Sequence, residues 1–69
     1  MLKKGDIAIQ VNVPEDSQFV VILGIHGGEV EHRHLKGSPS LHDHGVSSKR
    51  YIRKCTKKEL LIAKIRHGL

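Results

Sequence analysis

Residues 18–35 carry the sequence QFVVILGIHGGEVEHRHL, which predicts two antiparallel strands joined by a tight turn. Gly27 and Gly28 form the predicted two-residue turn, because glycine adopts positive φ without steric cost. The nearly continuous apolar run over 18–26 indicates a central strand, and residues 29–35 are expected to return beside it. This hairpin makes an antiparallel sheet the starting point for the rest of the chain.

The two-residue turn also predicts which side chains share a face of the hairpin, because strand side chains alternate between faces. Leu23 is expected opposite His32, and Val21 opposite His34. The more apolar face is expected to cover the core, and its members are Phe19, Val21, Leu23, Ile25, Val30, His32 and His34. The two histidines are therefore expected at the margin of the core.

Further strands are predicted on both sides of the hairpin. Residues 7–13 alternate between β-branched and smaller or polar side chains, which is typical of a half-buried strand. Residues 49–54 can form a short final strand. Residues 36–48 are rich in Gly, Ser, Pro and His, and predict either a long loop or a short, irregular pair of strands.

A helix is predicted over residues 57–67. Thr56 is a good N-cap and Glu59 stands three residues later, which is the pattern of a capping box. Gly68 is placed to end the helix. The large apolar side chains that share one arc of this helix are expected to pack on the sheet, and they are Leu61, Ile62 and Ile65.

These elements make a mostly β chain with one helix, arranged as a single domain. With 69 residues, the chain is long enough for one thin core and too short for a deep catalytic cleft. A β-rich part over 1–55 and a C-terminal helix over 56–67 are expected. A sheet this short hides its core best by curling, so a strongly curved antiparallel sheet or a small barrel is predicted.

Short motifs support that fold. Lys4-Gly5-Asp6 leads into the first strand, and Arg53-Lys54-Cys55-Thr56-Lys57-Lys58-Glu59 leads into the helix. Together with the glycine hairpin, they resemble small SH3-like barrel proteins of the KOW and Tudor type, including proteins of phages and mobile elements. The resemblance implies an SH3-like fold. The chain lacks the spaced glycines of a full KOW motif and the aromatic cage of a Tudor barrel, since Phe19 and Tyr51 are its only such rings.

The positive charge is concentrated in the last third of the chain. Residues 1–48 have a net charge of −2, whereas residues 49–69 have a net charge of +7, with Glu59 as their one acidic residue. Such a segment is typical of a protein that meets phosphate or an acidic protein surface. The candidate binding residues are Lys49, Arg50, Arg53, Lys54, Lys57, Lys58, Lys64 and Arg66.

Two partner classes follow from these cations. The first is the backbone of DNA or RNA, held without sequence preference, which the sequence alone narrowly favours. The alternative is a protein-interaction module, such as a phage-type accessory factor that docks on an acidic host protein. No enzymatic activity is expected, because the thin fold offers little enclosed volume in which a pKa can be shifted.

The histidines suggest a third, weaker function. Four of the six form two His-x-His pairs, His32 with His34 and His42 with His44. In a strand, residues two apart point to the same side, so each pair can offer two imidazoles to one zinc ion. The competing interpretation is four histidines without a common centre.

The cysteine content also indicates the cellular compartment in which the protein works. Cys55 is the only cysteine, so no intramolecular disulfide can form, and a reducing, cytoplasmic location is expected. It is expected to be an inert thiol at the junction between strand and helix. No apolar stretch approaches the ~20 residues of a membrane span, and no membrane partner is expected.

Overall fold

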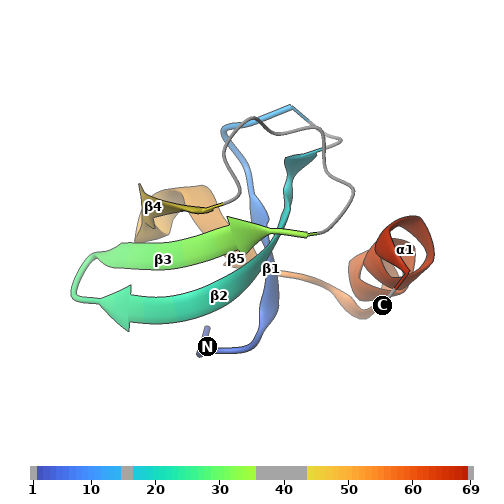
Figure 1. Cartoon of the computed structure of the whole chain (residues 1–69), viewed down its shortest axis with the longest axis horizontal. Helices are drawn as coiled ribbons and strands as arrows, with labels where there is room; N and C mark the ends of the chain where they lie inside the picture. Colours follow the sequence, from blue (N-terminus) through green and yellow to red (C-terminus); the bar gives the residue numbers. More distant parts are fainter. Residues whose placement is uncertain (1, 15–16, 36–43, 69) are drawn as a thin grey trace.

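The computed structural model describes residues 2–14, 17–35 and 44–68. Five antiparallel strands form one sheet in the order β4-β3-β2-β1-β5, and a helix follows the last strand (Figure 1). The elements in chain order are β1 (Ile7–Gln10), β2 (Phe19–His26), β3 (Glu29–His34), β4 (His44–Ser48), the 3₁₀ turn η2 (Lys49–Tyr51), β5 (Ile52–Lys54) and α1 (Lys57–His67). The predicted mostly β fold with a C-terminal helix is confirmed.

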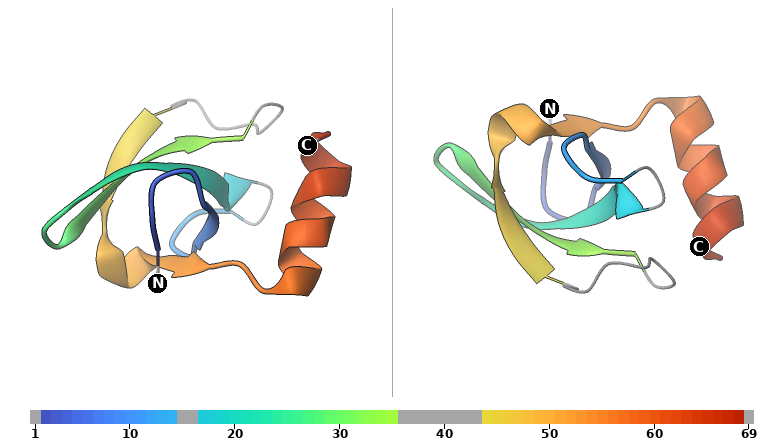
Figure 2. Two further views of the ribbon diagram at one scale, coloured as in Figure 1. Left: turned by 90° about the horizontal axis from the view of Figure 1, so that it is seen from below. Right: turned by 90° about the horizontal axis from the view of Figure 1, so that it is seen from above.

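The sheet is strongly curved but is not closed into a barrel. β4 and β5 are its two edges, and they are joined through η2 rather than paired with each other (Figure 2). The amide of Gln10 on β1 nevertheless donates to the hydroxyl of Ser47 on β4, with an Nε2···Oγ distance of 3.0 Å. Because β2 and β3 lie between these strands, only a curved sheet brings the two side chains together on its concave face.

Each face of the sheet has its own core. The buried apolar side chains of the concave core are Ala8, Val20, Ile22, Val30 and Ile52. The second core lies on the convex face, under α1, and consists of Ile9, Phe19, Leu35 and Ala63. Strand residues therefore alternate between the two cores, and both faces of the central strands are covered.

A bulge in β2 corrects the predicted register of the hairpin. Near the turn, Ile25 pairs with Val30 as expected, but the register shifts between Ile22 and Gly24. His32 therefore lies opposite Ile22 instead of Leu23, and is only 3% exposed. The predicted core face is wrong beyond the bulge, because one extra residue in a strand moves every later side chain to the other face.

The shift changes where the flanking side chains go. Val20, rather than Val21, lies opposite His34 and enters the concave core. Phe19 and Val21, predicted on the same face as His32, instead lie on the convex side with the residues under α1. His32 is consequently inside the concave core and not at its margin.

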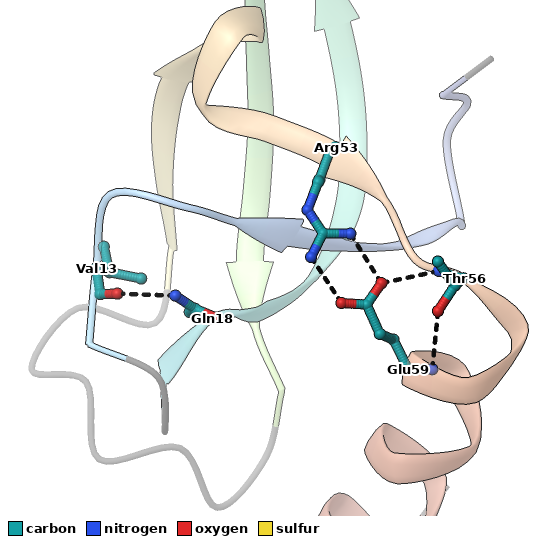
Figure 3. A network of polar contacts seen from close by, with 5 residues as sticks. All are labelled: Val13, Gln18, Arg53, Thr56 and Glu59. Atoms are coloured by element: carbon teal, nitrogen blue, oxygen red, sulfur yellow. Dashed lines mark hydrogen bonds and ion pairs between the residues drawn. The ribbon is translucent and has the colours of Figure 1, made fainter.

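β1 is shorter than the predicted strand over residues 7–13, because the chain leaves the sheet after Gln10. Val11 is 46% exposed and begins a turn. The side-chain amide of Gln18 donates to the carbonyl of Val13 over 3.2 Å, which links the segment after β1 to the start of β2 (Figure 3).

The final strand is also shorter than predicted, because residues 49–51 form η2. The backbone N–H of Lys49 donates to the carbonyl of Gly28 over 2.9 Å, which holds the start of η2 against the hairpin turn. After η2, Ile52 lies opposite Gln10, so β5 covers the free edge of β1. Residues 36–48 were predicted as a long loop or a short pair of strands. β4 forms the last part of this segment, and residues 36–43 lie outside the described residues.

Candidate docking surface

α1 begins and ends where the sequence predicts. The side chain of Thr56 accepts from the backbone N–H of Glu59 over 3.2 Å, and the Glu59 carboxylate accepts from the N–H of Thr56 over 3.0 Å. Gly68 ends the helix at φ 68° and ψ 34°, in the left-handed region. In the described part of the chain, no helix is long and apolar enough to cross a bilayer.

One carboxylate fixes α1 to the sheet. Arg53 on β5 donates two hydrogen bonds to Glu59, of 2.8 and 2.6 Å, while the same carboxylate completes the capping box (Figure 3). The hydrogen bonds from Arg53, followed by that from the backbone of Thr56, lower the pKa of Glu59 to about 2. The direction of α1 is therefore set by a bidentate ion pair at its first turn.

α1 packs on the convex face through its smallest apolar residue. Ala63 is completely buried, and it is the one buried residue of the helix. His67 stacks edge-on against Phe19 with 5.8 Å between ring centroids, and the Arg66 guanidinium lies 5.8 Å from the same ring. A small residue at the centre of this contact lets the helix approach the sheet closely.

The larger aliphatic side chains of α1 point into solvent, which corrects their predicted packing on the sheet. Leu61 is 58% exposed, Ile62 is 38% exposed and Ile65 is 77% exposed. Successive helix residues are rotated by about 100°, so Leu61 and Ile65 lie roughly opposite Ala63, and Ile62 lies on the flank of the helix. The arc that packs on the sheet is the one through Ala63 and His67.

All eight predicted binding cations are exposed, and they extend from η2 through β5 to α1. Of these eight, Arg53 alone has a carboxylate partner within the described ranges. Arg50 lies over the ring of Tyr51, with 4.9 Å from Cζ to the centroid. Because η2 and α1 lie at opposite ends of β5 (Figure 2), the cations form two groups joined by Arg53 and Lys54.

Lysines surround the exposed aliphatic side chains on the helix. Lys57 and Lys58 lie in the first turn, where the helix dipole disfavours a positive charge, and Lys64 lies beside Ile65 in sequence. We call the exposed side of the helix the α1 outer face, and its members are Lys57, Lys58, Leu61, Ile62, Lys64 and Ile65.

Two of the predicted metal ligands make other contacts. His32 shares a 2.9 Å hydrogen bond between its Nε2 and the hydroxyl of Ser47, and His44 shares one of 2.7 Å between its Nε2 and Glu31. Burial, followed by the nearby His34 and His44, lowers the pKa of His32, so this imidazole is neutral near pH 7. The hydrogen bond with His44, followed by that with His26, lowers the pKa of Glu31.

The predicted zinc site is not assembled by the described residues. Within residues 2–14, 17–35 and 44–68, no three His, Cys, Asp or Glu side chains are grouped so that they can hold a metal ion. His32 and His34 meet edge to face, with 5.8 Å between ring centroids. The fourth predicted ligand, His42, lies outside the described residues.

A cluster of polar side chains that the sequence analysis did not identify lies on the concave face. A hollow of about 310 Å³ opens there, and Gln10, His32 and Ser47 are among the residues that line it. Gln10 was expected on the polar side of a half-buried strand but is 7% exposed. The available signal was the predicted place of His32 on the core-facing side of the hairpin, because a buried imidazole needs a polar partner.

Cys55 lies half-buried beside the convex core. Burial raises the pKa of its thiol, and the nearby Glu59 carboxylate raises it further. The thiol is therefore protonated near pH 7 and is a poor nucleophile.

Comparison of this chain with protein-family models, with curated proteins and with solved structures gave no match.

Proposed function

We propose that this chain is a non-enzymatic binding module that docks on an acidic protein surface through α1. The observation that carries the proposal is the α1 outer face, where three large aliphatic side chains are exposed among lysines. Exposed apolar groups that cluster on a monomer are typical of a surface that meets another protein. The lysines add charge complementarity, which steers association toward an acidic partner.

The second candidate partner is a nucleic-acid backbone, and it is favoured by the cations near η2, which have no carboxylate partner in the described part of the chain. Against it, aliphatic side chains gain little from phosphate, which stays hydrated. Phe19 and Tyr51 offer little for stacking on bases, because Phe19 is buried and Arg50 lies over the ring of Tyr51. The positive charge is compatible with both partners. The exposed aliphatic side chains therefore favour a protein partner over nucleic acid.

Salt dependence separates the two partners. If the cations hold duplex DNA, four or five phosphate contacts give a slope of log K against log salt near −4, at about −0.9 per phosphate. Replacing Lys57 and Lys58 together by Ser then flattens the slope by roughly two units, whereas replacing Lys3 and Lys4 matters less. We expect only weak association with duplex DNA or single-stranded RNA at about 50 mM salt, lost at about 200 mM.

The variants provide the decisive comparison. Tight binding to DNA or RNA that survives about 200 mM salt and depends on Lys57 and Lys58 would overturn the proposal in favour of nucleic acid. A protein partner predicts instead that an acidic protein is bound and that substitutions on the α1 outer face, in its lysines or its aliphatic side chains, weaken this binding. Replacing Ile65 by Ser leaves any nucleic-acid binding unchanged.

We further propose that the curved sheet is of the SH3-like type and that the protein works in the cytoplasm. The strand order supports the first, because β1 lies between β2 and β5 and the chain returns through η2 to cover its free edge. A single cysteine supports the second. An experimental structure and fractionation of cells that express the tagged chain would test these two points.

A further inference from the structure

The three exposed aliphatic side chains of α1 form a ridge, which we call the apolar ridge: Leu61, Ile62 and Ile65. A helix on a sheet ordinarily turns its larger apolar residues inward. Here the inner arc carries the buried Ala63, while Ile65 is 77% exposed. Leu61 and Ile65 therefore contribute little to the packing of the described residues on one another, and Ile62 is the most covered of the three.

The charges around the ridge restrict what can cover it. Lys57, Lys58 and Lys64 are exposed on the same helix, and none has a carboxylate partner among the described residues. Glu59 is the one acidic residue of the helix, and its carboxylate already accepts hydrogen bonds from Arg53 and from the backbone N–H of Thr56. A second copy of this chain would bring lysines against lysines, because an isologous contact pairs a surface with itself.

We propose that α1 inserts the apolar ridge into an apolar groove of a partner protein, and that carboxylates at the rim of this groove face the lysines. This inference rests on the proposed function and specifies how its partner is recognised. Ile65 is the central anchor, because it is the most exposed of the three and lies between the other side chains around the helix. Binding of a helix in a groove commonly uses anchors spaced by three or four residues, as Leu61 and Ile65 are.

The first turn of the helix prepares this surface for binding. The capping box and the bidentate contact from Arg53 hold α1 in place before a partner arrives. A preorganised helix loses less conformational entropy on binding than a segment that must fold first. The ridge is thus presented on a rigid element.

The test begins with a photo-reactive amino acid at position 62, with position 46 as its control. Val46 is 55% exposed on β4 and lies outside α1. A protein that cross-links through position 62 and not through position 46 is identified and purified. Its affinity is then measured by calorimetry for the wild-type chain and for Ile65→Ser, Val46→Ser and Lys57→Ser with Lys58→Ser.

We expect Ile65→Ser to weaken binding at least about tenfold, while Val46→Ser leaves it unchanged. The double lysine variant is expected to weaken binding mainly at low salt. If only the double lysine variant loses affinity and Ile65→Ser binds as tightly as the wild type, the proposal of an apolar groove is wrong. The proposed docking on an acidic protein would then still hold. Cross-linking to nucleic acid alone would overturn both.

Two other occupants give distinct results. Cross-linked dimers, together with concentration-dependent sedimentation that Ile65→Ser abolishes, would show that a second copy covers the ridge. Binding to vesicles of phosphatidylserine and phosphatidylcholine that Ile65→Ser abolishes would show that a lipid surface does so. Either result would contradict the proposed groove. Circular dichroism of each variant confirms that the fold is retained.

Discussion

Glu59 joins the helix to the sheet with a single carboxylate that accepts from Arg53 and caps the first turn. Its pKa of about 2 lies below the ordinary value of 4.5. A carboxyl group with a lowered pKa in the folded state stabilises the fold fully above pH 4.5. That stabilisation is lost as the pH falls from 4.5 toward 2, because the unfolded chain takes up the proton first.

Glu59→Gln is therefore expected to lower Tm at pH 7, since the amide cannot form the ion pair. The difference in Tm between the variant and the wild type should shrink below pH 4.5 and nearly vanish by about pH 2. Thermal melts followed by circular dichroism from pH 7 to pH 2 measure this difference. A constant difference across that range would show that the carboxylate charge is not what the variant removes.

Ser47 connects three strands through one hydroxyl, since it contacts Gln10 on β1 and His32 on β3 from its place on β4. Ser47→Ala leaves both buried partners without this hydrogen bond, which is expected to cost about 1–3 kcal/mol of unfolding free energy. Urea denaturation measures the loss. Ser48→Ala is the matched control, because Ser48 lies on the same strand and its side chain makes no capping hydrogen bond. Equal effects of the two variants would contradict the role given to Ser47.

At the level of elements, local signals predicted the hairpin turn and both ends of α1. The glycine hairpin and the capping box of α1 are found as predicted, because each depends on residues adjacent in sequence. The register beyond Ile22 was wrong because a bulge depends on packing against both faces of the sheet. A signal for it was present, since an isolated glycine such as Gly24 inside a strand often marks a bulge.

The orientation of α1 was also predicted wrongly, for a different reason. Side-chain size suggested that Leu61, Ile62 and Ile65 pack on the sheet, but the space over Phe19 and Leu35 takes Ala63. How closely two elements approach is a tertiary property that helix periodicity alone does not contain. The candidate site was therefore half predicted, since the cations were identified but the aliphatic side chains among them were assigned to the core.

The close approach of α1 leads to a prediction at this level. Ala63→Leu overfills the contact with the sheet and is expected to cost about 1–3 kcal/mol of unfolding free energy. Leu61→Ala, two residues away on the exposed side, should change it by less than about 0.5 kcal/mol. Urea denaturation of both variants decides the orientation, because the reverse order of effects would place Leu61 against the sheet.

At the scale of the whole molecule, the two cores depend on different parts of the chain. The strands themselves, with Gln10 and Ser47 across the open side, enclose the concave core. The convex core needs α1, which supplies Ala63 over Phe19. Domains of this size bury only about 60% of the surface that their unfolded chain exposes, so neither core is dispensable. The helix that presents the apolar ridge is thus also part of the fold.

A chain that ends at Cys55 tests this dependence. Without α1, Ile9, Phe19 and Leu35 are left facing water, and the contact from Arg53 to Glu59 is lost. Burying a large apolar side chain contributes about 1.5–3 kcal/mol, and total stabilities are about 5–15 kcal/mol. We therefore expect the shortened chain to lack cooperative unfolding and to show poorly dispersed amide resonances. The full-length Ile65→Ser variant should keep both properties of the wild type, because its substitution lies on the outer side of the same helix. A shortened chain with native dispersion and a sharp urea transition would show that α1 is an appendage, held by the sheet without supporting it.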